Sequence, residues 1–199
     1  MPAADRQKWD EKYARGEHAT DVPSRVIERV GTRCCQIASG MKGGVEPALG
    51  RALELAGGAG RHSLWFAARG YDVTLTDVSR VALELARQRA AARALELRTF
   101  AVDLEESPFP SGPWDLIFSH HYLWRPLFAE FPATLAPGGL VLIVQPTVRN
   151  LERHARPPAP FLLEEGELPR LLAPLTIDFY EEGWNEEGRH EAVAVARLA

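Results

Sequence analysis

Short apolar runs alternate along the chain with longer segments in which apolar residues recur every three or four positions. The runs predict strands and the longer segments predict helices, because a packed element needs an apolar face. The predicted strands of this central part cover residues 52–56, 71–76, 97–102, 114–118 and 140–145. The predicted helices cover residues 61–69, 79–94 and 127–135, the last followed by the turn Pro137-Gly138-Gly139. This alternation is typical of a parallel sheet covered by helices on both faces.

The N-terminal part of the chain, before the alternating strands and helices, is predicted to be helical. It predicts a short helix up to about Gly16, with Trp9 and Tyr13 one turn apart on one face. A second helix is predicted over residues 24–37, where apolar positions repeat at helical spacing, and a loop follows at 39–44.

The C-terminal part predicts a short helix at 167–172 and then two strands, 177–182 and 191–197. The polar segment between these strands, 183–188, contains no crossover helix, so the strands must pair antiparallel as a hairpin. We therefore expect a doubly wound α/β fold with seven strands, mostly parallel, that ends in an antiparallel C-terminal hairpin strand.

Size and composition limit the class of protein. The chain has 199 residues, of which 46% are hydrophobic and 25% charged, which is a globular balance. We expect one domain over residues 1–199, made of an N-terminal helical lid segment (1–40) and a core sheet (50–199). The formal net charge of −4 gives the molecule no overall attraction to nucleic acid or anionic lipid.

Further features argue for a cytoplasmic protein with no metal site. The N-terminal residues are charged, and the longest apolar run, Leu140 to Val144, is too short to span a bilayer. The two cysteines, Cys34 and Cys35, are adjacent, and no His/Cys cluster has metal-ligand spacing. Reduced thiols are the simplest interpretation.

A glycine-rich segment follows the first central strand. A strand that enters such a turn and then a helix lets a nucleotide-like ligand lie across the carboxyl end of the sheet. Glycines remove Cβ atoms that would collide with that ligand and permit backbone angles that other residues avoid. The candidate ligand contacts here are Glu54, Ala56, Gly57, Gly58, Gly60 and His62.

Acidic residues also end the next two strands. Asp77 is placed to accept hydrogen bonds from both hydroxyls of a ribose, with Val78 beside it. Asp103 could accept from an exocyclic amine, and Leu104 could contact the face of an adenine. Each acid alone could instead be a helix cap or a loop residue. Acids at three successive strand ends on one edge favour a nucleoside-containing ligand.

At this point the chain resembles a known family. The run Glu54-Leu55-Ala56-Gly57-Gly58-Ala59-Gly60-Arg61 is similar to the first motif of class I S-adenosylmethionine (SAM) methyltransferases. Ala56 stands at the first glycine of that pattern. The resemblance covers about residues 50–145 and implies that SAM is the cofactor, held by the residues named above.

A narrower resemblance extends to both ends. Trp9-Asp10-x-x-Tyr13 and the segments 122–128 and 156–168 are similar to bacterial methyltransferases of the tellurite-resistance and thiopurine group. The resemblance implies that the N-terminal segment, with Trp9 and Tyr13, closes over the cofactor; alternatively both side chains only pack the first helix onto the sheet. Gln145-Pro146 departs from the pattern, where an acid followed by Thr is expected.

Four polar residues follow the fourth strand, where an acceptor must approach the methyl group. Ser119 is a candidate cofactor contact, and His120, His121 and Tyr122 are candidate catalytic residues. One histidine could take a proton from the acceptor, or it could merely line the pocket. The segment is not the N/D-P-P-Y/F motif of many amino-group methyltransferases, which disfavours chemistry on exocyclic amines.

The expected function is methyl transfer to a small acceptor that is anionic or soft (S, Se or Te). The basic segment 149–156, with Arg149, Arg153 and Arg156, could attract an anion or form a lid. Three alternatives stay open: a nucleic-acid methyltransferase, which the net charge disfavours; a non-catalytic SAM-binding module; and an NAD-dependent oxidoreductase, whose fingerprint would lack its last glycine at Ser63. We expect no membrane partner, and the pattern leaves the oligomeric state open.

Overall fold

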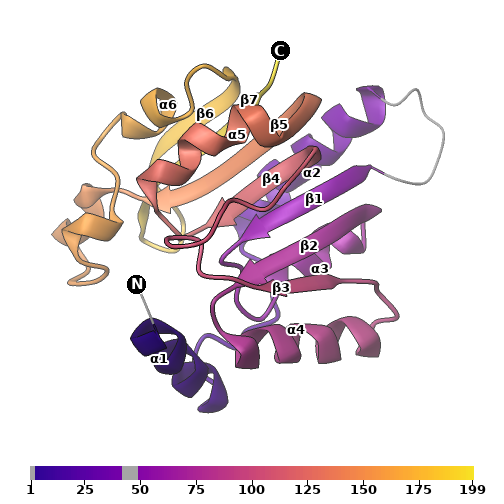
Figure 1. The fold of residues 1–199 in the computed structure, drawn as a ribbon. Helices are drawn as coiled ribbons and strands as arrows, with labels where there is room; N and C mark the ends of the chain where they lie inside the picture. The colour runs from indigo at the N-terminus through magenta and orange to yellow at the C-terminus, as the bar shows by residue number, and fades with distance from the viewer. Residues whose placement is uncertain (1–2, 42–48) are drawn as a thin grey trace.

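A seven-stranded sheet crosses the middle of the molecule in the order β3-β2-β1-β4-β5-β7-β6 (Figure 1). The computed structural model describes residues 3–41 and 49–199. The strands are β1 (Gly50–Leu55), β2 (Tyr71–Asp77), β3 (Arg98–Ala101), β4 (Trp114–His120), β5 (Leu135–Pro146), β6 (Thr176–Trp184) and β7 (His190–Arg197). The helices are α1 (Ala3–Ala14), α2 (Arg25–Met41), α3 (Arg61–Ala67), α4 (Arg80–Ala92), α5 (Phe131–Thr134) and α6 (Glu167–Leu171), with the 3-10 helices η1 (Arg125–Glu130), η2 (Val148–Glu152) and η3 (Ala159–Phe161).

The strand directions confirm the predicted fold class. The pairs β1–β2, β2–β3, β1–β4 and β4–β5 are parallel. β7 pairs antiparallel with both β5 and β6, so the last two strands form the predicted hairpin. The order reverses between β1 and β4, which is the switch point where ligands bind in open α/β sheets.

Alternating side chains build a separate core on each face of the sheet. Leu116 and Phe118 of β4 pack in the cluster that includes α2 and α3, whereas Ile117 between them packs in the cluster that includes α5 and α6. All three are fully buried. Each such side chain is worth about 1.5–3 kcal/mol relative to an exposed one. This packing fixes the carboxyl ends of β1, β2 and β4 at one edge, where the candidate residues lie.

Two predicted elements are corrected by the structure. The single helix expected at 127–135 is instead η1 followed by the short α5, because Pro132, inside the expected helix, lacks the N–H that a continuous helix requires. The turn Pro137-Gly138-Gly139 is not the boundary of β5: the strand already begins at Leu135, and residues 136–139 bulge out before pairing resumes at Leu140.

The loop expected at 39–44 is also partly wrong. α2 continues to Met41, and the Ser39 hydroxyl donates to the Cys35 carbonyl one turn earlier (2.8 Å), a bond that is compatible with helix. Residues 42–44 of that prediction lie outside the described residues. Within the described part of the chain, no helix is long and apolar enough to cross a membrane, and no cluster of His, Cys, Asp and Glu could hold a metal ion.

α1 lies beside α4, at the carboxyl ends of the strands (Figure 1). Asp10 anchors it there, because its Oδ1 accepts from the Ser79 hydroxyl (2.6 Å) and from the Val81 amide (3.1 Å) at the start of α4. Ser79 itself caps α4 by accepting from the Ala82 amide (3.1 Å). The N-terminal helix is therefore docked on the edge of the sheet that carries the candidate residues.

Candidate functional site

The glycine-rich segment forms a tight turn between β1 and α3. Gly58 and Gly60 have φ of +58° and +75°, the left-handed region that favours glycine. Asp77, at the end of β2, supports the turn: one carboxylate oxygen accepts from the Gly58 amide (2.8 Å) and the other from the Ser79 amide (2.8 Å). The ends of β1 and β2 are thus connected by a single carboxylate.

Glu54 lies beneath this turn and is only 1% exposed. Its carboxylate accepts from the amide of Ser63 (3.0 Å) and from its hydroxyl, and it lies 3.5 Å from Nδ1 of His62. A Cβ added to Gly57 would come within 2.3 Å of this carboxyl group. Glu54 therefore organises the turn and the start of α3, and it lines neither of the cavities described below.

A cavity of about 150 Å³ opens where β1, β2 and β3 end. Nine of the candidate residues come together there: Trp9, Tyr13, Ala56, Asp77, Val78, Asp103, Leu104, His121 and Tyr122. Three further residues complete the lining, Asp5, Val102 and Glu105. These three have no motif of their own, although Val102 and Glu105 flank the predicted Asp103-Leu104.

Tyr13 covers the glycine turn from α1. A Cβ added to Gly58 would lie 2.0 Å from the Tyr13 hydroxyl oxygen, so the phenol rests directly on the backbone of the turn. Burial, and then the charges of Asp77 and Glu54, raise the pKa of Tyr13, so the phenol stays neutral at physiological pH. Trp9 lies one turn away on the same helix (ring centroids 6.2 Å apart).

Asp77 is held in an environment that disfavours its charge. Burial raises its pKa from 3.8 to about 6, although the hydrogen bonds from Ser79 and Gly58 act in the opposite direction. Each of its oxygens accepts one backbone hydrogen bond and keeps a second lone pair. Asp77 can therefore still accept from a bound ligand.

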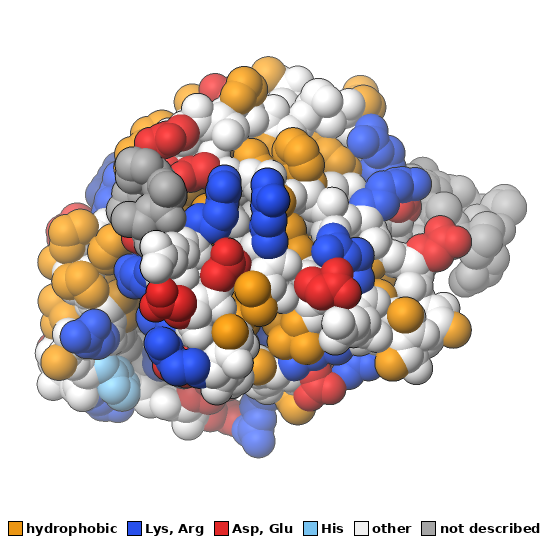
Figure 2. Space-filling model, turned by 60° about the horizontal axis from the view of Figure 1, so that its bottom comes forward, with side chains coloured by type: hydrophobic (Ala, Val, Ile, Leu, Met, Phe, Trp, Pro, Cys, Tyr) orange, Lys and Arg blue, Asp and Glu red, His pale blue; other side chains and the backbone are white. Residues whose placement is uncertain are grey.

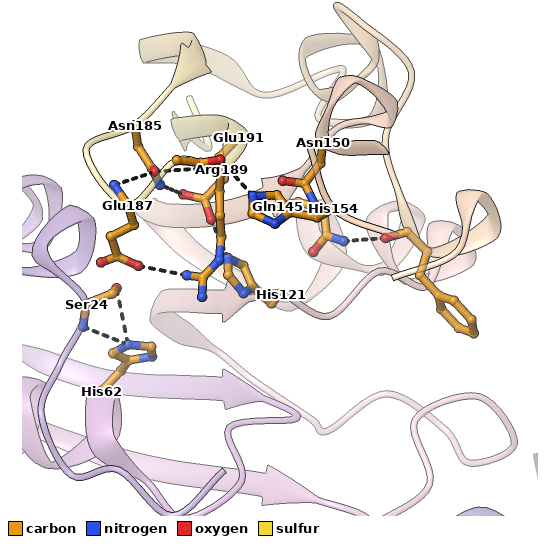
Figure 3. Close-up of polar contacts among 12 residues, drawn as sticks. Ser24, His62, His121, Gln145, Asn150, His154, Asn185, Glu187, Arg189 and Glu191 are labelled. Atoms are coloured by element: carbon orange, nitrogen blue, oxygen red, sulfur yellow. Dashed lines mark hydrogen bonds and ion pairs between the residues drawn. The ribbon is translucent and has the colours of Figure 1, made fainter. Parts of the chain in front are cut away.

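Three histidines stack at the end of β4. The ring of His120 lies 4.5 Å from that of His62 and 3.8 Å from that of His121, measured between centroids. Ser24 donates its backbone N–H to Nε2 of His62 (3.3 Å; Figure 3), so the proton of neutral His62 is on Nδ1, toward Glu54. Burial and the neighbouring histidines lower the pKa of His120 well below its usual value, so this ring is neutral.

A second, larger cavity of about 540 Å³ adjoins His120. His120 lines it, together with residues from the start of α2 and from the β6–β7 hairpin. The lining residues that the sequence did not single out include Ser24, Arg25, Arg29, Trp184, Asn185, Arg189 and Glu191. They come from segments more than 60 positions from β4 in the sequence, so only the fold brings them to the site.

The remaining candidates support the site from within the protein. Gly57 and Gly60 shape the turn, and the Ser119 hydroxyl donates to the Tyr122 carbonyl (3.3 Å). The predicted His62 contacts Ser24 instead of opening into either cavity. Among the basic residues of 149–156, Arg149 pairs with Glu152 (2.8 Å) and Arg153 stacks on Trp184 (3.7 Å).

Known proteins share both the sequence pattern and the fold. Over residues 52–139 the chain matches the family described as methyltransferase domain. Demethylmenaquinone methyltransferase of Thermus thermophilus is 32% identical over 108 residues, which are 51% of this chain and 49% of that protein. The chain thus spans about half of the length of this curated relative.

Two solved structures extend the likeness over almost the whole chain. TehB from Haemophilus influenzae has a TM-score of 0.68 and 21% identity, covering 96% of this chain and 67% of that one. A TehB-like SAM-dependent methyltransferase from Corynebacterium glutamicum has a TM-score of 0.60 and 19% identity, covering 97% and 95%. At these identities the likeness concerns the fold. Together with the motifs and the matched domain, it supports a class I SAM-dependent methyltransferase with a fold similar to that of TehB.

Proposed function

We propose that this protein transfers the methyl group of SAM to a small acceptor with a soft nucleophilic atom, namely sulfur, selenium or tellurium. The observation that carries the proposal is the pair of cavities that adjoin the histidines at the end of β4. His121 lines the smaller cavity and His120 lines the larger one. A methyl donor in the first and an acceptor in the second would meet beside these two rings.

The smaller cavity suits the nucleoside part of SAM. Asp77 keeps lone pairs that can accept from ribose hydroxyls, Asp103 can accept from an adenine amine, and Leu104 offers an apolar contact. Ala56 adds only a methyl group at the first position of the turn. When bound, SAM supplies a methyl group on a positively charged sulfur that is already activated for displacement. The protein then has to orient the two reactants and exclude water.

Entry of the cofactor requires α1 to move. A cavity of about 150 Å³ is smaller than the roughly 300–1,000 Å³ typical of sites for ligands of this size. Tyr13 covers Gly58, beside which the methionine part of SAM would lie. We therefore treat α1 as a lid that shifts when SAM binds and then closes over it, as the resemblance implies for Trp9 and Tyr13.

The charges around the larger cavity favour a neutral acceptor over an anion. Its lining contains five glutamates, at 181, 182, 186, 187 and 191, and three arginines, at 25, 29 and 189. Each arginine pairs with a glutamate of the lining: Arg25 with Glu186 (2.5 Å), Arg29 with Glu181, and Arg189 with Glu187 (2.7 Å). The charges of this lining therefore give an anionic acceptor less support than a neutral one.

A nucleic-acid substrate has less support. Acidic and basic side chains are interspersed over the face shown in Figure 2, so a phosphate backbone would meet no continuous basic surface there. Arg149 is engaged with Glu152, and Arg153 with Trp184.

The test is methyl transfer from radiolabelled SAM to a panel of acceptors. The panel contains small thiols, selenite, tellurite, small carboxylates, and total tRNA and rRNA. We expect labelling of at least one soft acceptor, with neutral thiols ahead of the anions selenite, tellurite and carboxylates. Labelling of RNA without modification of a small acceptor would contradict the proposal.

A further inference from the structure

Glu191 is a buried carboxylate beside a candidate catalytic histidine. It directly precedes the apolar residues of β7, and it is 3% exposed. Its Oε1 lies 2.6 Å from Nε2 of His121, and its Oε2 accepts from Nδ2 of Asn185 at 2.8 Å (Figure 3). Burying a carboxylate is costly unless it is paired. Both oxygens of Glu191 are paired, one of them to a residue that lines the smaller cavity.

The antiparallel pairing of β7 places this acid at the reactive edge. Glu191 is opposite Pro146, the last residue of β5, and Ala192 is opposite Gln145. The methyltransferases that this sequence resembles are expected to have an acid at the end of β5, where this chain has Gln145. The neighbouring strand supplies a carboxylate at that same end of the sheet.

The contact with Glu191 determines which nitrogen of His121 is free. Burial raises the pKa of Glu191, but the hydrogen bonds from His121 and Asn185 and the neighbouring positive charge together outweigh burial, so the pKa of this carboxyl lies below its usual value. An ionised carboxylate can only accept a hydrogen bond. Nε2 of His121 must therefore carry a proton, and in neutral His121 the lone pair is on Nδ1.

The backbone of His121 shows that its position is constrained. Its φ is +63°, in the left-handed region that non-glycine residues rarely occupy. Its amide donates to the Val144 carbonyl of β5 (2.9 Å), which fixes this conformation. Strained residues of this kind concentrate at active sites. His120, by contrast, has no hydrogen-bond partner for its ring among the described residues, so nothing orients it as a base.

We infer that Glu191 is the positioning residue of His121, and that it holds Nε2–H so that Nδ1 receives the proton of the methyl acceptor. The inference rests on the proposed function. In the reaction, the acceptor meets the methyl group at the edge of the smaller cavity, which His121 lines. There the X–H bond of a neutral acceptor breaks and its proton goes to Nδ1 of His121. The electron pair of X forms the new bond to the methyl carbon, while the pair of the broken carbon–sulfur bond stays on sulfur. His121 then returns the proton to solvent.

The test compares Glu191→Gln with Asp178→Asn. Asp178 is the matched control, because it is a partly buried carboxylate on the same hairpin that pairs with Arg197 (3.0 Å) away from the site. Long-range nitrogen–proton NMR spectra of the His121 ring, identified by their absence in His121→Gln, report its tautomer without any turnover. We expect protonated Nε2 in the wild type and in Asp178→Asn, and a mixture of tautomers in Glu191→Gln.

The kinetic arm uses the thiol that the wild type methylates best. Glu191→Gln should lower kcat about 100-fold, the scale of general-base catalysis, with KM and the affinity for S-adenosylhomocysteine unchanged. Asn185→Ala keeps the carboxylate but removes one of its anchors, so it should lower kcat about tenfold.

Two results would overturn the inference: an unchanged His121 tautomer in Glu191→Gln, or a kcat of that variant equal to that of Asp178→Asn. If the wild type modified no acceptor, the proposed function would fail instead. The NMR spectra would then decide separately whether Glu191 positions the ring.

Discussion

Replacing Asp77 by asparagine should weaken SAM binding while leaving stability at neutral pH nearly unchanged. Raising the pKa of a carboxyl from 3.8 to about 6 costs the ionised folded protein about 3 kcal/mol, at about 1.4 kcal/mol per pKa unit. Asp77→Asn removes that cost. It also leaves one of the amides of Gly58 and Ser79 without its acceptor, since the amide side chain has a single oxygen, and this costs about 1–3 kcal/mol.

At pH 7 the cost of ionised Asp77 and the cost of the lost hydrogen bond nearly cancel, so the two proteins have nearly equal stability. On acidification their stabilities diverge. Unfolded chains ionise Asp77 near pH 3.8, whereas the folded protein keeps it protonated up to about pH 6. The folded state thus binds more protons between these values, so the wild type gains stability from this group as the pH falls through that window. The variant gains nothing. Between pH 7 and pH 4.5 the difference between the two proteins should move by about 2 kcal/mol in favour of the wild type, or about 4–8 °C in melting temperature.

The assay is thermal unfolding of both proteins at pH 7 and pH 4.5, with SAM affinity measured by calorimetry at pH 7. SAM affinity of Asp77→Asn should fall about ten- to a hundredfold, because hydrogen bonds to a charged group are lost. Asp115→Asn is the control: Asp115 also accepts a backbone hydrogen bond, from Arg51 (2.8 Å), at the other end of the sheet. If Asp77→Asn lost several degrees at pH 7 and bound SAM like the wild type, Asp77 would be a structural cap only.

Three further outcomes are expected. Gly58→Val should abolish SAM binding but keep the melting transition, because the left-handed φ and the contact with Tyr13 leave no room for a side chain; calorimetry showing wild-type affinity would refute this. Asp10→Ala should increase protease cleavage of α1 and weaken SAM binding about tenfold, because the Ser79 hydroxyl loses its acceptor. Glu11→Ala, at an exposed position of the same helix, should do neither. Equal cleavage and equal SAM affinity in the two variants would contradict the role of α1 as a lid. SAM should raise the melting temperature and NAD should not; the reverse would favour an oxidoreductase.

The sequence predicts the central sheet well because its signals are local. Apolar runs and helical periodicity define β1 to β5, and the absence of a crossover helix before β7 predicts the antiparallel hairpin. The wrong predictions occur where a single residue or a strand pairing outweighs the local apolar pattern. Pro132 divides the helix expected at 127–135. The turn at Pro137-Gly138-Gly139 becomes a bulge within β5, because Leu135, before the turn, still pairs with Trp114 of β4.

The residues of the candidate site likewise include some that the sequence predicts and some that only the fold reveals. Residues at strand ends, such as Asp77 and Asp103, are predictable because a parallel sheet gathers these ends at one edge. Glu54 follows the motif, yet its carboxylate lies under the turn and bonds Ser63, a direction that sequence does not encode. Glu191 carries no local signal: it reaches His121 only through the pairing of β7 with β5.

The most direct measurement for the arrangement proposed here is a crystal structure of the protein with S-adenosylhomocysteine. We expect the ribose on Asp77, the adenine beside Asp103 and Leu104, and the sulfur facing His121, with Tyr13 moved off Gly58. The larger cavity, which His120 lines, should stay open to the acceptor. A ligand bound in the larger cavity, or bound with Tyr13 still resting on the glycine turn, would contradict the assignment of the two cavities.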